Sequence, residues 1–184
     1  MEFLRLVVVL VMGCALLAVG VVLAQPGPGS GERDRLDKLF RAGNYKDAFD
    51  GYRALALDAK SKSDTIRLEF ERAIACLAPL GRIDEIDDFR EAAVAVHQGS
   101  RQLLEAAAAS CLDETHFGTV VAGKFHRGGG QGGGRSVRSN ERDRSRALQL
   151  LVQGLDLVRL DADRTAAGGY YLTLARALMS GREQ

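Results

Sequence analysis

The sequence predicts an all-α protein in which antiparallel helical hairpins stack into a short right-handed solenoid, interrupted by one glycine-rich loop. Residues 36–97 contain the same hairpin pattern twice, with turns at Gly43 and Gly81. The offset of 38 residues lies within the range of helix-pair solenoids. Apolar residues recur at steps of three and four through most of the chain, and no segment shows sustained alternation of apolar and polar residues. We therefore expect very little β-sheet.

Composition indicates one ordinary soluble domain with additional terminal segments. The chain has 184 residues, of which 46% are hydrophobic and 27% are charged. Its formal net charge is +1, which gives no overall attraction to nucleic acid or to an anionic membrane. An electrostatic partner would have to be recognised by a local patch.

The amino-terminal segment is an export signal. Residues 6–24 carry no charge, follow Arg5 and end in Val22-Leu23-Ala24. Small residues at this end predict a signal peptide cleaved after Ala24. The alternative is a retained N-terminal anchor, because 19 apolar residues can span a hydrocarbon core of about 30 Å. Both place the body of the chain in the periplasm, the cell envelope or the extracellular space.

A short linker separates this segment from the predicted helical domain. Residues 25–32 are rich in Pro, Gly and Ser, a composition typical of a flexible or extended connection. The helical repeat domain then covers residues 33–184. Met12-Gly13-Cys14 resembles a lipoprotein signal, but the apolar run that follows Cys14 argues against it.

Five apolar stripes predict the first five helices. The first ends at Gly43, and the third continues to Pro79 and Gly81. Their members, helix by helix, are Leu36, Leu39 and Phe40; Tyr45, Ala48, Phe49, Tyr52, Leu55 and Ala56; Ile66, Phe70, Ala73, Ile74 and Leu77; Ile83, Ile86, Phe89, Ala93 and Val96; and Leu103, Leu104, Ala107, Cys111 and Leu112.

The helical period stops at residues 116–139, where we expect a glycine-rich loop. Residues 128–134 are six glycines around Gln131, and loops of this length are uncommon unless they are functional or disordered. Helicity resumes at Asn140, a candidate N-cap. Two stripes follow it: Leu148, Leu151, Val152, Leu155 and Val158; then Tyr170, Tyr171, Leu174, Ala175 and Leu178.

The last helix is expected to leave one apolar side uncovered. A solenoid needs a capping element with a polar outer face, and residues 180–184 do not supply one. The sequence therefore predicts a truncated product or the amino-terminal part of a longer polypeptide.

Two resemblances follow from these motifs. Residues 39–48 and Tyr52 resemble the crossing from the first to the second helix of a tetratricopeptide repeat, although the usual proline after Asp58 is absent and Ile86 replaces a small residue in the second copy. Residues 81–91, 121–128 and 141–150 are similar to the amino-terminal helical region of large exported bacterial alpha-2-macroglobulin-like proteins. The resemblance implies a helical appendage of a secreted protease-trapping or envelope-associated protein. The family's Cys-Gly-Glu-Gln thioester element does not occur in this sequence, so inhibitor activity is not implied for this chain.

Two glycine motifs raise the alternative of nucleotide binding. Residues 118–125 match a phosphate-binding P-loop except at Phe125, which lacks the hydroxyl that would hold Mg²⁺ and is followed by residues unsuited to begin a helix. The glycine run also satisfies a dinucleotide fingerprint, but no predicted strand precedes it. We expect no catalytic residues, no cofactor and no enzymatic activity.

The cysteines and histidines do not form a recognisable metal site. Cys111, His116 and His126 lie within 16 residues, but none of their spacings is a typical pair of zinc ligands. We expect a buried helical cysteine and two loop histidines, with no bound metal. Cys76 and Cys111 are 35 residues apart, and they form either a disulfide or two buried free thiols.

A basic stretch is the candidate contact surface. We expect it to be either a solvated loop leading into a charged helix or a docking site for an acidic surface of a partner protein or of another domain of a longer chain. The candidate partner-binding residues are Lys124, His126, Arg127, Arg135, Arg138 and Arg142. Nucleic acid is not an expected partner, and a membrane is expected only through residues 6–24 if they are retained.

The predicted function is that of a non-catalytic exported helical-repeat scaffold that mediates protein–protein interaction. One alternative is an enzyme that binds phosphate or a nucleotide through Gly118–Arg138. The other is a membrane-anchored envelope assembly factor.

Overall fold

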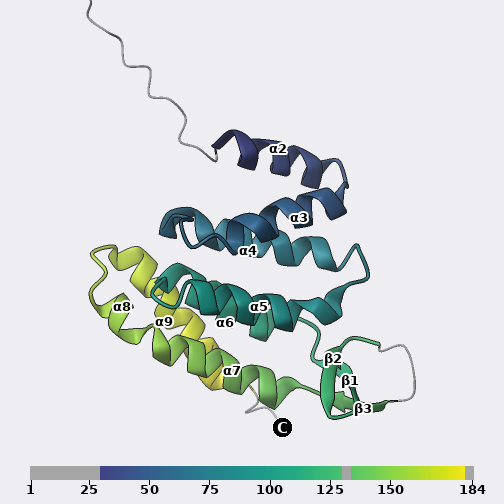
Figure 1. Ribbon diagram of the computed structural model, residues 1–184. Helices are drawn as coiled ribbons and strands as arrows, with labels where there is room; N and C mark the ends of the chain where they lie inside the picture. Colours follow the sequence, from purple (N-terminus) through teal and green to yellow (C-terminus); the bar gives the residue numbers. More distant parts are fainter. Residues whose placement is uncertain (1–29, 130–133, 181–184) are drawn as a thin grey trace, which may run out of the picture. The chain divides into compact units, whose positions relative to one another are not determined.

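The computed structural model describes residues 30–129 and 134–180 and is mostly helical. The predicted export segment and residues 25–29 of the linker lie outside the described residues. The described residues from Glu32 onward pack as one unit (Figure 1). The described elements are α2 (Ser30–Arg41), α3 (Tyr45–Ala56), α4 (Ser63–Leu77), the 3₁₀ helix η1 (Ile83–Glu85), α5 (Ile86–Val96), α6 (Arg101–Asp113), β1 (Phe117–Val121), β2 (Lys124–Arg127), β3 (Arg135–Arg138), α7 (Asn140–Gln153), α8 (Leu155–Arg159) and α9 (Arg164–Met179).

The two glycine turns that suggested a repeat have the same backbone geometry. Gly43 and Gly81 adopt φ values of +78° and +66°, which L-residues with a side chain rarely adopt. After α2, the amide of Asn44 donates to the carbonyl of Leu39 at 2.9 Å. After α4, Arg82 donates to Leu77 at 2.9 Å. Both turns are Schellman motifs, which satisfy the last carbonyls of a helix and reverse the chain. The two segments therefore share the geometry of this turn.

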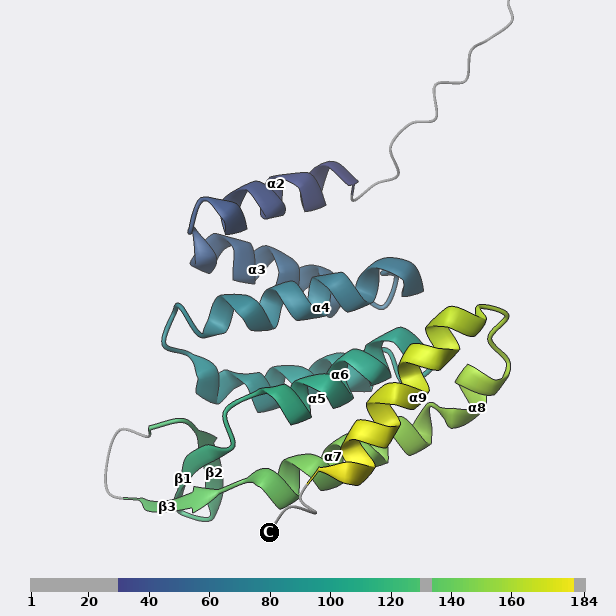
Figure 2. The same ribbon diagram turned by 180° about the vertical axis from the view of Figure 1, so that it is seen from behind.

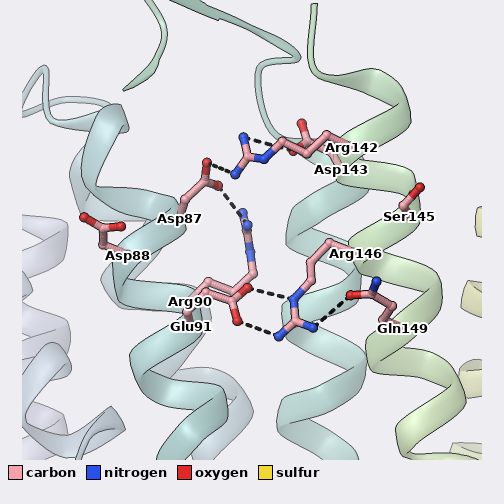
Figure 3. Close-up of a pocket in the computed structure, with 9 residues that line it drawn as sticks. All are labelled: Asp87, Asp88, Arg90, Glu91, Arg142, Asp143, Ser145, Arg146 and Gln149. Atoms are coloured by element: carbon pink, nitrogen blue, oxygen red, sulfur yellow. Dashed lines mark hydrogen bonds and ion pairs between the residues drawn. The ribbon is translucent and has the colours of Figure 1, made fainter. Parts of the chain in front are cut away.

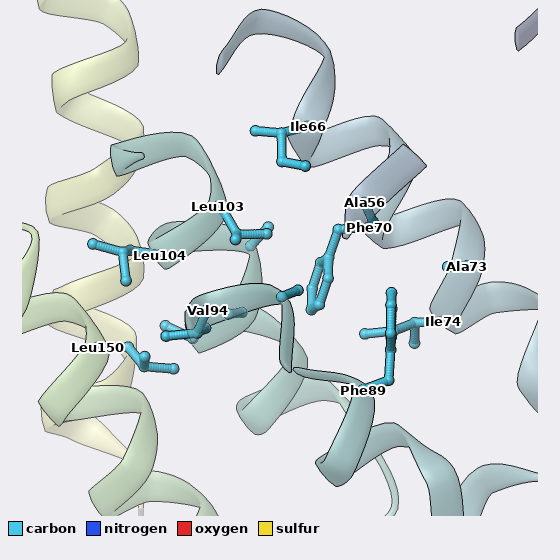
Figure 4. Packing of buried hydrophobic residues seen from close by; sticks show 14 of the residues in the cluster. Ala56, Ile66, Phe70, Ala73, Ile74, Phe89, Val94, Leu103, Leu104 and Leu150 are labelled. Atoms are coloured by element: carbon cyan, nitrogen blue, oxygen red, sulfur yellow. The ribbon is translucent and has the colours of Figure 1, made fainter. Parts of the chain in front are cut away.

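The core lies between the helices, and α6 is at its centre. This helix packs against α4, α5, α7 and α9. Three consecutive alanines of α6, residues 106–108, are buried, and such small side chains let neighbouring helices approach closely. Between α4 and α5, Phe70 stacks on Phe89 with ring centroids 5.5 Å apart (Figure 4). One continuous apolar cluster joins all these layers.

The prediction of an all-α protein is confirmed in part: the described residues are mostly helical, but β1, β2 and β3 form a small three-stranded antiparallel sheet of order β2-β1-β3. Most of the segment predicted as a glycine-rich loop is therefore regular structure. Thr119 of β1 lies opposite His126 of β2 and Ser136 of β3. The strands are four or five residues long, too short for a sustained period of two to show in the sequence. The predicted glycine-rich connection falls partly on residues 130–133, which lie outside the described residues.

The turn between β1 and β2 explains a further part of this error. Ala122 and Gly123 both have positive φ, at 48° and 82°. This combination is typical of a two-residue type I′ hairpin turn, which usually carries Asn-Gly. Because Ala occupies the first position, the sequence lacked the usual hairpin signal.

The structure also bears on three other predictions from the sequence. Asn140 is the first residue of α7, and Ser139 occupies the N-cap position. The helix predicted to run to Val158 is interrupted at Gly154, where α7 ends and α8 begins. Cys76 and Cys111 are buried free thiols, and burial raises the pKa of each to about 11. A solenoid is not recognised in the described helices, so the class that we state is a mostly helical unit with a small antiparallel sheet.

We expect Gly81→Ala to lower the free energy of unfolding by about 1–2 kcal/mol, because a side chain is unfavourable at positive φ. No heavy atom lies within 4 Å of a Cβ added at Gly81, so the loss would come from the backbone alone. Gly99→Ala is the matched control, since that site is equally open and its φ is not in the left-handed region. Urea denaturation of both variants measures the difference, and equal stabilities would contradict the assigned turn.

Candidate functional site

A buried arginine joins the sheet to two helices. Arg127, the last residue of β2, has a side chain with 0% exposure and reaches between α5 and α7. Its Nη2 donates to Asp87 Oδ1 at 2.7 Å and to Asp143 Oδ1 at 2.9 Å. Its Nη1 donates to Asp143 Oδ2 at 2.9 Å and to the carbonyl of Thr115 at 2.5 Å. One guanidinium therefore binds two carboxylates and one backbone carbonyl from three segments of the chain.

Both aspartates accept further hydrogen bonds. Asp87 also binds Arg90 Nη1 at 2.8 Å and Arg142 Nη2 at 2.7 Å, and Figure 3 shows these two arginines converging on it between the helices. Asp143 is 2% exposed, accepts from the Ser139 hydroxyl at 2.7 Å and contacts His116 Nδ1 at 2.9 Å. We call Asp87, Arg90, Arg127, Arg142 and Asp143 the ion network.

The local sequence explains why these groups meet. Asp87 and Asp143 each lie in the first turn of a helix, where the helix dipole favours a carboxylate. In β2, alternation places Phe125 and Arg127 on the same face of the sheet. The guanidinium of Arg142 lies over the Phe125 ring, 4.3 Å from its centroid. The inner face of the sheet is therefore held by ion pairs and by this cation–π contact.

The electrostatics of the network favour ionised carboxylates. Burial alone would raise the pKa of Asp87, but the hydrogen bond from Arg142 and the charges of Arg90 and Arg127 lower it to about 2. Burial opposes ionisation of Asp143 as well, and the hydrogen bonds from Arg127, His116 and Ser139 outweigh it, so its pKa is also lowered. Such groups hold ion pairs at neutral pH and do not exchange protons there.

A hollow of about 460 Å³ lies beside the network between α5 and α7 (Figure 3). It is lined by Asp87, Asp88, Arg90, Glu91, Arg142, Asp143, Ser145, Arg146 and Gln149. Arg146 binds Glu91 through Nε at 2.8 Å and also contacts Gln149. The lining residues include no cysteine or histidine, and Ser145 is the only hydroxyl. This lining holds opposite charges together and offers no pair of nucleophile and base.

A second hollow, of about 580 Å³, lies between the turn after α4 and the sheet. Its lining includes Asp84, Thr119 and His126. The hydroxyl of Thr119 is buried and has no hydrogen-bond partner among the described residues. His126 and Thr119 are opposite each other in the sheet, so the hollow follows the outer face of β1 and β2.

The structure disperses the candidate partner-binding residues. Arg127 is fully buried, and Arg142 is bound to Asp87. Lys124 is exposed and pairs with Asp88 at 3.1 Å. His126 lines the second hollow, whereas Arg135 and Arg138 are exposed on β3. The basic stretch is therefore divided between the interior, α7 and the exposed parts of the sheet.

The other candidate motifs take different roles. Residues 118–125 span most of β1, its hairpin turn and the start of β2, whereas a phosphate-binding loop leads into the amino end of a helix. His116 contacts Asp143 and the carbonyl of Leu112 at 3.2 Å, and Cys111 is buried in α6. No group of three candidate metal ligands occurs in the part of the chain that the structure describes.

The network aspartates were missed as functional positions by sequence reasoning. Neither aspartate was among the candidate contact residues. Each lies in the sequence among several other charged residues. Their selection depends on Arg127, which is 40 and 16 residues away, respectively, and no local pattern carries this pairing.

Comparison with known proteins finds no matching family model, no similar curated protein and no similar solved structure. Within the described residues, no helix has the length and apolar character needed to cross a membrane.

We expect Arg127→Met to lower the free energy of unfolding by about 3–5 kcal/mol, because it leaves two buried carboxylates without their shared cation. Arg135→Met, on the exposed strand β3, is the matched control and should change stability by less than about 0.5 kcal/mol. Urea denaturation of both variants tests this expectation. Similar stabilities for the two variants would show that Arg127 does not hold the sheet in place.

The ion network also predicts a loss of stability in acid. Because the pKa of Asp87 falls from an ordinary 3.8 to about 2 on folding, its contribution is present above about pH 4 and is lost as the pH falls towards 2. The contribution is on the order of 2 kcal/mol. The stability difference between wild type and Asp87→Asn should therefore be constant at neutral pH and shrink between pH 4 and pH 2.

Denaturation at several pH values measures this difference. Asp88→Asn is the control, since the Asp88 side chain is 74% exposed and its substitution should have little effect. A pH-independent effect of Asp87→Asn would contradict the assigned ion pairs.

Proposed function

We propose that this chain is a non-catalytic, exported helical-repeat scaffold that binds a partner protein. In this proposal the hairpins α2–α3 and α4–α5 are tetratricopeptide-like units. The matching Schellman turns at Gly43 and Gly81 support the repeat. The resemblance of residues 81–91, 121–128 and 141–150 supports a role as an amino-terminal appendage of an alpha-2-macroglobulin-like protein. Export rests on the apolar segment 6–24.

The outer face of the sheet is the proposed docking surface. Strand alternation and register place one set of side chains on this face: Phe117, Thr119, Val121, Lys124, His126, Ser136 and Arg138. Thr119 is buried, so the accessible part of this face consists of the other side chains. Phe117 and Val121 are 44% and 39% exposed. Their apolar surface adjoins the cations Lys124 and Arg138, a combination that suits a partner segment with acidic and apolar residues.

The single observation that carries this proposal is the fixed position of the sheet. Its inner face is bound to α5 and α7 through Arg127 and Asp143, so its outer face is ordered before a partner arrives. Pre-organisation reduces the entropy lost on binding. Figure 1 places the strands beside the amino-terminal ends of α5 and α7, on one end of the stacked helices.

The alternative of a nucleotide-binding enzyme is less well supported by the geometry. A P-loop leads into the amino end of a helix, whereas residues 118–125 span β1, a hairpin turn and the start of β2. Calorimetric titration with Mg-ATP separates the two functions, because sub-millimolar binding would overturn the non-catalytic proposal. The alternative of a membrane-anchored assembly factor depends on residues 1–24, and amino-terminal sequencing of the exported chain would decide whether they are retained.

Site-specific photo-crosslinking in the producing cell tests the docking surface. We expect a photoreactive phenylalanine analogue at Phe117 to form a discrete adduct with a protein whose crosslinked peptide is acidic. The same analogue at Leu68 of α4 is the matched control, because its 43% exposure is almost equal to that of Phe117.

Charge reversal sharpens the experiment. Lys124→Glu combined with Arg138→Glu should reduce the Phe117 adduct by about tenfold, because like charges then face the acidic partner. Stability should change little, since both residues lie at the surface. Equal adduct yields at Phe117 and Leu68 would contradict the proposed surface. A yield at Phe117 that is unchanged by the charge reversal would also contradict it.

A further inference from the structure

The strand β3 lies at an open edge of the sheet. Because the strand order is β2-β1-β3, each outer strand pairs with β1 on one side only. Of the two outer strands, β2 also contacts η1. Among the described residues, no second strand pairs with β3. Figure 2 shows β3 on the side of the sheet away from α5, where a further strand has room to bind.

The register shows which backbone groups of β3 face this edge. The amide of Ser139, directly after β3, donates to the carbonyl of His116 at 3.0 Å. In an antiparallel ladder, such hydrogen-bonded pairs alternate with pairs that are not hydrogen-bonded. Val137 therefore exchanges hydrogen bonds with β1, whereas the N–H and C=O groups of Ser136 and Arg138 point away from β1. Both residues are exposed. The edge thus offers two donors and two acceptors to an added strand.

The charges at this edge are positive and are not neutralised by the described part of the chain. Arg135 and Arg138 are the first and last residues of β3, and both are exposed. Neither forms an ion pair with a described residue. By contrast, Lys124, Arg127 and Arg142 each bind a carboxylate of α5. The two arginines of β3 therefore remain available to the carboxylates of a partner.

The same charges argue against a second copy of this chain as the occupant. Exposed edges are commonly protected from unwanted pairing by proline, by a bulge or by charge. β3 contains no proline, and its register with β1 contains no bulge. A second copy that paired through its own β3 would bring four arginines onto one short edge, and like charges across strands are destabilising. The edge thus disfavours an identical strand and favours an acidic one.

We propose that the acidic partner segment binds as a fourth, antiparallel strand along β3, an inference that rests on the proposed function. In this direction the partner residue opposite Arg138 comes first, and the residue opposite Arg135 follows three positions later. Both are acidic, because opposite charges across strands stabilise the pair. The residue opposite Val137 is apolar. The first and third residues lie on the outer face of the sheet, beside Arg138 and Ser136, and extend the proposed docking surface.

A synthetic peptide of this pattern, Ser-Glu-Val-Thr-Glu-Ser with both ends capped, is the probe. Titration into the full chain is followed through the amide NMR signals. We expect a dissociation constant of about 0.1–1 mM, because the contact is short, with the largest shifts at Ser136 and Arg138. The same peptide with lysine in place of both glutamates should bind at least about tenfold more weakly. No shift at about 2 mM of the glutamate peptide would overturn the proposal.

N-methylation of the peptide separates strand addition from other modes of binding. A methyl group on the threonine nitrogen removes an N–H that donates to the carbonyl of Ser136, so binding should weaken by about tenfold. A methyl group on the valine nitrogen is the matched control, because that N–H points away from β3. Its effect should stay within about twofold. Equal effects of the two methyl groups would overturn the proposal.

Substitutions in β3 test the same contact from the side of the protein. Ser136→Pro removes an N–H at the free edge, where proline is tolerated, and should weaken peptide binding by about tenfold. Ser136→Ala keeps the N–H and is the control. Arg138→Glu should weaken binding by about tenfold, and a peptide with lysine in place of its first glutamate should restore it. Failure of this restoration would contradict the antiparallel register.

The Ser136→Pro chain also distinguishes this inference from the proposed function. Its Phe117 adduct in the producing cell should fall by about tenfold if the partner adds a strand. An adduct of unchanged yield would overturn strand addition, while the outer face of the sheet would stand as the docking surface. An absent Phe117 adduct in the wild-type chain would instead contradict the docking surface itself.

Discussion

The position of the sheet depends on one buried guanidinium. Arg127 is the only residue of β2 that reaches both Asp87 and Asp143, two aspartates on different helices that lie more than 50 residues apart in the chain. Removing two carboxylates and an arginine from water is costly unless each finds partners. Here Asp87 also binds Arg90 and Arg142, and Asp143 also binds Ser139 and His116. The network is therefore stable only as a whole.

This constraint gives the unit two different modes of cohesion. The helices are held by apolar packing, with the buried alanines of α6 at the centre and the stacked rings of Phe70 and Phe89 further out. Apolar packing is non-directional and tolerates adjustment among neighbours of similar volume. The sheet is held by ion pairs, which have fixed geometry. The outer face of the sheet is therefore oriented more sharply than packing alone would orient it.

The same network accounts for the character of the hollow between α5 and α7. General acid–base catalysis needs groups whose protonation can change near the working pH. The arginines instead lower the pKa of Asp87 and of Asp143, which fixes both carboxylates in the charged form. Arg146 and Glu91 neutralise each other in the same way at the edge of the hollow. The charges of this region join elements of the fold.

The helical part of this protein could be predicted from the sequence alone, because its signals are local. Apolar residues at steps of three and four, with glycines at 43 and 81, located every α-helix from α2 to α7 and also α9. The sheet could not be predicted, since its strands are short and Ala122 occupies a turn position that usually carries Asn. The sequence indicated Arg127 as a candidate contact residue, but it did not indicate that its side chain is buried. Its pairing with Asp87 and Asp143 joins segments far apart in the chain, and so does the exposure of Leu172 and Met179 on the free side of α9. Local order follows from the spacing of residues within one helix, whereas burial and ion pairing depend on which segments meet, and only the tertiary structure decides that.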